Sequence, residues 1–233
     1  MSISKHGIEC HNFLLLVVCL VLLSYGSSAT APGFQFFKLV LQWPPSFCSL
    51  SESNCKRTPL PLAFTIHGLW PDNKSQELRY CTSNLVPNIK SDFAKQLDKS
   101  WPDLKEQHQT PPDEKFWIRE WNKHGTCSSN MYSPTDYFKK ALVLKSRYNV
   151  LVMLQEKQYK PGTKMLLLAE VNLTIADYIG GLPIIKCPKG LLTEVIICVD
   201  PIGGTVVNCP LPAFSKPCPQ TKIDFPATVK PQT

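Results

Sequence analysis

Histidine is scarce in this chain, which has five among 233 residues. Two of them lie in the N-terminal segment, so only His67, His108 and His124 are left for acid/base chemistry near neutral pH. The sequence also lacks the G-x-S-x-G pattern of a serine nucleophile and the H-E-x-x-H pattern of a zinc protease. No C-x-x-C pair occurs either, which argues against a zinc site built from cysteines.

Long apolar runs are few as well. The longest extends from Phe13 to Leu23, follows Lys5, and gives way to the small residues Ser28 and Ala29. This run is too short to span a bilayer, which takes about 18 residues or more. The pattern predicts a secretory signal peptide over residues 1–29 and a mature protein that is secreted, extracellular and free of the membrane.

Eight cysteines remain after the predicted signal peptide is removed. They are Cys48, Cys55, Cys81, Cys127, Cys187, Cys198, Cys209 and Cys218. An even number in an exported chain predicts disulfides. The count alone does not choose among the pairings, which number on the order of 100.

Residues 30–233 fit one domain with a short irregular C-terminal tail, because no repeat or polar linker divides them. Two sequons, at Asn73 and Asn172, predict N-glycosylation. The formal net charge of +7 would attract polyanions, which include nucleic acid, anionic polysaccharide and acidic membrane. Charge by itself does not choose among these partners.

The pattern of apolar and breaker residues predicts a mixture of strands and helices. Strands are expected at residues 34–43, 63–70, 191–200 and 204–210, and the second of them is expected to break just after His67, at Gly68 and Pro71. Helices are expected at residues 91–101 and 112–125, with one or two more after residue 133. Because no βαβ period repeats, an α+β fold is predicted.

Two stretches, FTIHGLWPDN and FWIREWNKHGTC, contain the histidines of interest, since His108 lies in a polar loop. On a helix, Glu120, Lys123 and His124 share one face. The helix end and the nearby carboxylate should make His124 more basic than a free imidazole unless burial opposes this. His67 is expected to end a strand and to face His124 across a cleft.

One imidazole that takes a proton while another gives one suits cleavage of RNA, in which the 2′-hydroxyl attacks phosphorus and no metal is required. Lys123 and Arg119 could stabilise the added negative charge, and Glu120 could keep these groups in register. Trp70 offers a face for base stacking, and Asp72 could accept hydrogen bonds from a base edge. DNA lacks the 2′-hydroxyl and is excluded as a substrate.

The same residues allow three other interpretations. The two histidines could be ordinary core residues. A metal site formed by His67, His124 and Glu120 is possible, although Glu-x-x-x-His is not a common metal motif. Nucleophilic hydrolysis is disfavoured, because the serine motif is missing and the cysteines are expected to be paired.

At these two stretches the sequence resembles the secreted T2 ribonucleases and, within them, the plant self-incompatibility ribonucleases. The start LVLQWPPSFC, the eight cysteines and the late CP segments also fit. The resemblance implies an α+β fold with a central antiparallel sheet and four disulfides. It also implies endonucleolytic cleavage of single-stranded RNA through a 2′,3′-cyclic phosphate, with no metal and no cofactor.

The resemblance implies a role for individual residues. His67 would be the general acid and His124 the general base, with Glu120 and Lys123 stabilising the pentacoordinate phosphorus. Substrate contacts are implied for Trp70 and Asp72 at one base and for Phe116 and Gln42 on the other side of the scissile bond. The implied disulfides are Cys48–Cys55, Cys81–Cys127, Cys187–Cys218 and Cys198–Cys209.

Arg119 is a departure from the family pattern, because many relatives have a third histidine there. The phosphate-binding role of that third histidine is either lost here or passes to the guanidinium of Arg119, which binds phosphate well. This replacement and the basic charge favour the self-incompatibility branch.

We therefore expect a secreted, monomeric ribonuclease that is the pistil determinant of self-incompatibility. The alternatives are a general extracellular ribonuclease for defence or phosphate recycling and a catalytically silent binding protein. The expected partner is RNA, and a pollen F-box protein is implied by the family alone. Variable recognition is expected in residues 74–90.

Overall fold

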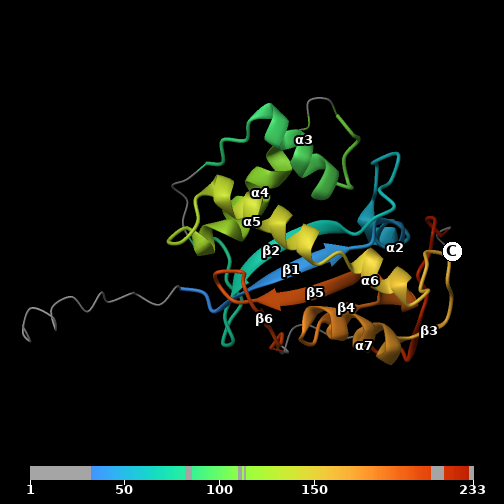
Figure 1. Cartoon of the computed structure of the whole chain (residues 1–233). Helices are drawn as coiled ribbons and strands as arrows, with labels where there is room; N and C mark the ends of the chain where they lie inside the picture. The colour runs from blue at the N-terminus through green and yellow to red at the C-terminus, as the bar shows by residue number, and fades with distance from the viewer. Residues whose placement is uncertain (1–32, 82–85, 110–111, 113, 211–217, 231–233) are drawn as a thin grey trace, which may run out of the picture. The chain divides into compact units, whose positions relative to one another are not determined.

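A computed structural model describes residues 33–81, 86–109, 112, 114–210 and 218–230, and the predicted signal peptide lies outside them (Figure 1). The strands are β1 Phe36–Gln42, β2 Thr65–Asp72, β3 Leu166–Leu167, β4 Ile184–Lys186, β5 Glu194–Val199, β6 Val206–Val207 and β7 Lys222–Ile223. The helices are α2 Pro44–Cys48, α3 Ser91–Ser100, α4 Lys115–Lys123, α5 Pro134–Arg147, α6 Val150–Glu156 and α7 Leu168–Ile179. Short 3-10 turns occupy η1 Ser51–Ser53, η2 Gly125–Ser128 and η3 Pro188–Gly190.

The main sheet is antiparallel and has the order β2-β1-β5-β4, with β6 paired to β5. Strands β3 and β7 form a separate two-stranded sheet. Helix α5 packs against β1 and β2, and α3 contacts α5 from above, whereas α7 lies on the side of β4 (Figure 1). Four disulfides are present, and they are the pairs that the resemblance implies: Cys48–Cys55, Cys81–Cys127, Cys187–Cys218 and Cys198–Cys209. The predicted α+β fold class is confirmed.

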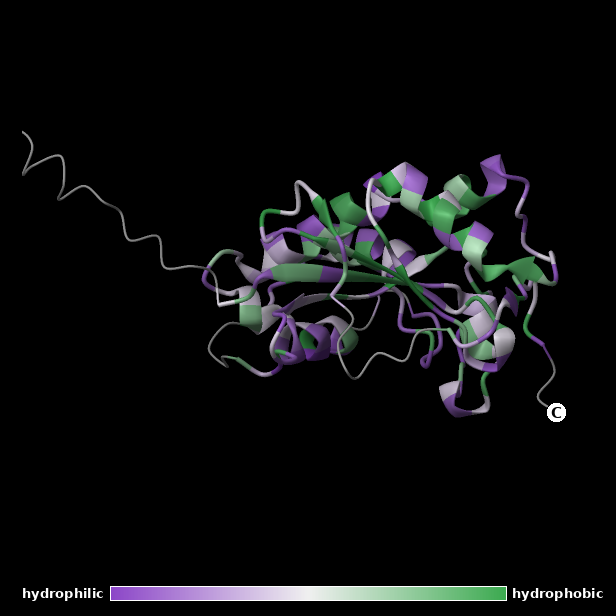
Figure 2. Ribbon diagram, turned by 90° about the horizontal axis from the view of Figure 1, so that it is seen from below, coloured by the Kyte–Doolittle hydropathy of each residue, from purple (hydrophilic) through white to green (hydrophobic). Residues whose placement is uncertain are grey.

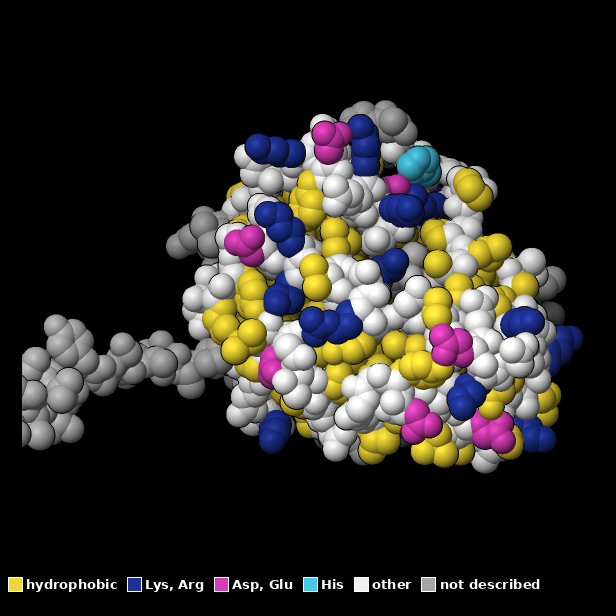
Figure 3. All heavy atoms as spheres, viewed as in Figure 1, with side chains coloured by type: hydrophobic (Ala, Val, Ile, Leu, Met, Phe, Trp, Pro, Cys, Tyr) yellow, Lys and Arg dark blue, Asp and Glu magenta, His cyan; other side chains and the backbone are white. Residues whose placement is uncertain are grey.

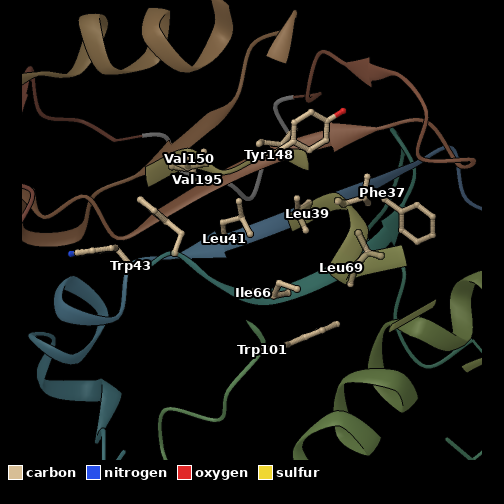
Figure 4. Packing of buried hydrophobic residues seen from close by; sticks show 14 of the residues in the cluster. Phe37, Leu39, Leu41, Trp43, Ile66, Leu69, Trp101, Tyr148, Val150 and Val195 are labelled. Carbon is tan, nitrogen blue, oxygen red and sulfur yellow. The ribbon is translucent and has the colours of Figure 1, made fainter. Parts of the chain in front are cut away.

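The central strands are hydrophobic along their length, whereas the helices carry mixed faces (Figure 2). In β1 the alternate residues Phe37, Leu39 and Leu41 are fully buried and belong to the main core. Trp101 and Val195 join the same cluster from other parts of the chain (Figure 4). Burial of an aliphatic or aromatic side chain contributes about 1.5–3 kcal/mol, so this face of the sheet dominates the stability.

The expected break of the second strand at Gly68 and Pro71 is wrong, because β2 continues from Thr65 to Asp72. Pro71 pairs with Phe37 within the ladder. A proline has no N–H to donate, but β2 is the edge strand of the sheet, where one donor can be missing without cost to a neighbour. His67 therefore lies inside a strand, not at its end.

The helix expected at residues 112–125 is shorter at both ends. It starts at Lys115 and ends at Lys123, with His124 as its C-cap residue. Residues 224–230, the described part of the chain after β7, are anchored to the core. Phe225 is fully buried, and Nε1 of Trp43 donates a 2.7 Å hydrogen bond to the carbonyl of Pro226.

Candidate active site

His67 occupies a β-bulge in β2. The β1–β2 register shifts between Val40 and Leu41, which leaves His67 as the extra residue of its strand. A bulge redirects a side chain from the regular alternation and is common beside active sites. The carbonyl of His67 accepts a 3.0 Å hydrogen bond from Nε1 of the buried Trp101.

The same tryptophan links β2 to α4. The carbonyl of Trp101 accepts a 2.8 Å hydrogen bond from Nε1 of Trp117, which lies on α4 and is also buried. Two indole N–H groups thus connect the helix to the bulge that holds His67. Because buried indole donors need a partner, each bond also satisfies a polar atom of the core. The distance between the strand and the helix is fixed by these two contacts.

Nδ1 of His67 lies 2.6 Å from Oε1 of Glu194, at the start of β5. Burial disfavours the charged imidazole, but the hydrogen bond and negative charge of Glu194, aided by Glu120, raise the pKa of His67 above its ordinary value of 6.5. Lys186 opposes this increase. The His67 side chain still exposes 36% of its surface.

His124 caps the C-terminal end of α4. Its N–H donates to the carbonyl of Glu120, and its own carbonyl accepts from Cys127, each over 3.0 Å. Cys127 forms a disulfide with Cys81, and the adjacent Tyr80 donates its N–H to the carbonyl of Lys123 over 2.9 Å. The helix end is therefore fixed on two sides, which holds His124 in place.

The His124 ring is almost fully buried, with 3% exposed, and its Nδ1 has no hydrogen-bond partner. Burial lowers the pKa of His124 to about 3, and the charges of Lys123 and Arg79 act in the same direction. Burial therefore overcomes the helix end and carboxylate that favour a basic His124. The ring is neutral at neutral pH and can accept a proton.

Trp70 brings the two histidines together. Its ring stacks on His124, with centroids 4.9 Å apart and planes at 23°, and meets His67 edge-on at 5.3 Å. Both imidazoles therefore border one indole. A Cβ added at Gly68 would lie 1.9 Å from Nε1 of Trp70, so only glycine leaves room for the ring in this position.

Glu120 lies in the same cluster. Burial raises the pKa of its carboxyl, against the lowering effects of His67 and Trp70. Oε2 of Glu120 and Nε1 of Trp70 are both buried, but no hydrogen bond of normal geometry joins either atom to a partner. The site thus contains polar atoms that a ligand could satisfy.

The other residues of α4 that were predicted to contact the substrate lie in two different places. Lys123 is partly exposed at the helix end, and its charge acts on both Glu120 and His124. Arg119 instead lies 5.8 Å from the ring centroid of Phe116 and bonds to Asp103 at 3.1 Å. These three residues line a pocket of about 290 Å³, which does not include the two histidines.

Gln42 and Asp72 differ in whether their side-chain oxygens have polar partners. Gln42 is buried, its Oε1 has no partner, and it pairs across the ladder with Glu194. Asp72 is also buried, but it forms an ion pair with Lys38 and accepts 2.9 and 3.3 Å hydrogen bonds from backbone N–H groups after β2. The structure thus gives Asp72 a structural role, and its contact with a base stays a prediction.

Sequence reasoning missed Glu194, the carboxylate that contacts His67. A signal was present, because Glu194 is the one charged residue in the otherwise apolar strand β5. A buried acid in such a strand needs a partner. The roles of Lys38 and Trp101 had no comparable signal.

Among the residues that the structure describes, no helix has the length and apolarity needed to cross a membrane. Within the same ranges, no group of three or more His, Cys, Asp or Glu residues is arranged to hold a metal ion.

The antiparallel sheet and helix α4 thus place two imidazoles, whose pKa values are shifted in opposite directions, beside one indole. The profile of the Ribonuclease T2 family matches residues 34–209. The chain belongs to this family.

The chain is similar to known plant proteins over most of its length. It is 48% identical to Ribonuclease S-2 of Antirrhinum hispanicum over 92% of this chain and 91% of the relative. It is 35% identical to extracellular ribonuclease LE of Solanum lycopersicum, over 92% and 95%. The solved structure of the Nicotiana alata gametophytic self-incompatibility associated SF11-RNase superposes with a TM-score of 0.72 at 32% identity, over 83% of this chain and 99% of that one.

Proposed function

We propose that this protein is a secreted endoribonuclease that cleaves single-stranded RNA by attack of the 2′-hydroxyl on phosphorus. One observation carries the proposal: two imidazoles border one indole, and their surroundings move their pKa values in opposite directions. Two titratable groups whose pKa values are moved apart in this way are suited to act as the acid and the base. Membership of the Ribonuclease T2 family supports the same chemistry.

The neutral His124 is the general base and removes the proton from the 2′-hydroxyl. The resulting oxygen forms a bond to phosphorus, the bond from phosphorus to the 5′-oxygen breaks, and His67 protonates the departing oxygen. The product is a 2′,3′-cyclic phosphate. The pKa of His124 is low for a base, but a bound phosphodiester adds negative charge beside the ring and raises it.

Lys123 stabilises the extra negative charge on the phosphorus oxygens, and Glu120 holds the helix face in register. Trp70 contacts a base, since its ring lies beside both histidines, and Gln42 contacts the substrate on the other side of the scissile bond. Phe116 and Arg119 contact the substrate on the other flank of α4, where they line one pocket. Lysines and arginines are spread over the face in Figure 3, which suits general attraction of a polyanion.

The activity is tested with purified protein, a single-stranded RNA and a DNA of matching sequence. We expect the RNA to be cut in the presence of EDTA, with 2′,3′-cyclic phosphate ends identified by mass spectrometry, and the DNA to stay intact. Loss of cleavage in EDTA that added metal restores would contradict the metal-free mechanism. Intact RNA under all conditions would favour the silent binding protein, which the presence of His67, Glu120, Lys123 and His124 argues against.

For the biological role, we favour the pistil determinant of self-incompatibility. The 48% identity to Ribonuclease S-2 supports it, while the 35% identity to an extracellular ribonuclease supports a general role in defence or phosphate recycling. Expression confined to the style, measured by transcript and protein levels across tissues, is the expected result. Induction in roots or leaves on phosphate starvation would reverse the preference. A monomeric state and a pollen F-box partner stay predictions.

Secretion is supported by the four disulfides and by the extracellular relative. Of the two predicted glycosylation sites, the geometry favours Asn73. Its Oδ1 accepts a 2.8 Å hydrogen bond from the Ser75 hydroxyl in a surface turn. Asn172 lies inside α7, and Thr174 of its sequon is buried. The variable segment proposed at residues 74–90 begins in the same turn.

A further inference from the structure

A carboxylate that the proposed mechanism does not use is buried behind the acid histidine. Glu194 begins β5 and exposes only 8% of its surface. Its Oε1 contacts Nδ1 of His67 at 2.6 Å, and its Oε2 lies 3.9 Å from Nζ of Lys186 on β4. A buried carboxylate without partners is costly, so these two contacts keep the group charged in the core.

Charged groups face His67 from three elements. Glu194 comes from β5, Lys186 from β4 and Glu120 from α4, and His124 lies across Trp70. Of the groups that favour the imidazolium, only Glu194 is in hydrogen-bond contact with the ring. Burial raises the pKa of Glu194, but the contact with His67 outweighs it and leaves the pKa lowered, so this carboxylate can only accept.

The contact therefore determines which ring nitrogen carries the fixed proton. An ionised carboxylate has no proton to donate, so Nδ1 of His67 must be the N–H donor in both protonation states of the ring. The second nitrogen, Nε2, is then the one that gains and loses a proton. The bulge in β2 and the indole bond to the His67 carbonyl fix the backbone, and Glu194 fixes the ring.

We propose that Glu194 is a positioning residue that holds His67 in the Nδ1–H form and retains a protonated Nε2 for the leaving 5′-oxygen. The inference rests on the proposed function and deepens it. During cleavage, the Nε2 proton moves to the 5′-oxygen as its bond to phosphorus breaks, while the 2′-hydroxyl proton moves to His124. Nδ1–H stays bonded to Glu194 throughout, so the two catalytic histidines exchange protonation states and no proton is gained or lost.

The variant Glu194→Gln tests this role, because the amide oxygen keeps a hydrogen-bond acceptor while the negative charge is removed. The acid must be protonated, so activity falls as pH rises through the pKa of His67. Without the charge, the basic limb of the kcat/KM profile should shift to lower pH by about one unit or more, with about tenfold lower kcat/KM above that limb. Glu170→Gln is the matched control, since it removes one exposed negative charge on α7 and should leave the profile unmoved.

An unshifted profile in a folded Glu194→Gln protein that still requires His67 for cleavage would overturn the inference while leaving the proposed function intact. Inactive wild type and control proteins would instead overturn the proposed function. If the variant does not fold, long-range 1H–15N correlation spectra of the wild type decide the question. We expect neutral His67 to be protonated at Nδ1, and protonation at Nε2 in the neutral ring would refute the proposal.

Discussion

Replacing either His67 or His124 with alanine is expected to lower kcat for RNA cleavage by about 10²–10⁴-fold. Each variant removes one of the two proton transfers, and among the described residues no other imidazole lies in the cluster around Trp70. The two transfers belong to one reaction step, so the double variant should lose much less than the product of the single losses. Initial rates on a defined oligonucleotide at several pH values measure both effects.

The control for this experiment is His108→Ala, which removes the exposed histidine of the loop before α4. It should keep wild-type activity. Circular dichroism and the melting temperature show whether each variant is folded, and we expect that they are. Nδ1 of His124 makes no hydrogen bond that its removal would leave unpaired. A folded variant at either site that retained more than a tenth of the wild-type rate would contradict the two-imidazole mechanism.

The second large effect concerns stability in acid. The pKa of His124 is lowered to about 3 in the folded protein, mainly by burial, against an ordinary value of 6.5. Between these values the unfolded chain binds a proton that the folded chain does not. The free energy of unfolding should therefore fall as pH decreases, by about 1.4 kcal/mol per pH unit and by on the order of 5 kcal/mol across the window.

Urea unfolding at several pH values between about 6.5 and 4 measures this slope. In His124→Asn the neutral amide cannot take up the proton. The slope of the unfolding free energy against pH should therefore decrease by up to the contribution of one proton, about 1.4 kcal/mol per pH unit. The pair of Glu194 and His67 is retained in the variant. Its stabilisation is greatest between the ordinary values of 4.5 and 6.5, and it is lost in acid as Glu194 is protonated and at higher pH as His67 loses its proton. Equal slopes in wild type and variant would contradict the assignment to His124.

The sequence predicted which side chains lie together better than it predicted their pKa values. The two motifs correctly indicated that His67, Trp70 and His124 lie together, because apolar runs next to acid/base groups are unusual. The burial of His124 depends on rings that the fold brings to it, and local spacing does not reveal such packing. Glu194 is 127 residues from His67 in the chain, so the contact follows from the pairing of strands and not from a motif.

The fold also has elements that local sequence predicts and elements that depend on the rest of the structure. Helices with a strong apolar period, such as α3 and α4, were predicted from their own residues. Strand β2 was expected to break after His67 because local rules treat Gly68 and Pro71 as breakers. Its place at the sheet edge overrides these rules, since an edge strand tolerates a missing donor and a bulge.

The two indole bonds from Trp117 to Trp101 and from Trp101 to His67 have a consequence for how this protein can change. They fix the relative position of strand and helix from inside the core, while Cys81 and the backbone of Tyr80, in the segment after β2, hold the end of α4. Side-chain changes in that segment outside Cys81 can then alter what the outer surface presents while His67 and His124 keep their geometry. Related chains can therefore differ at this surface and still place His67 and His124 beside Trp70.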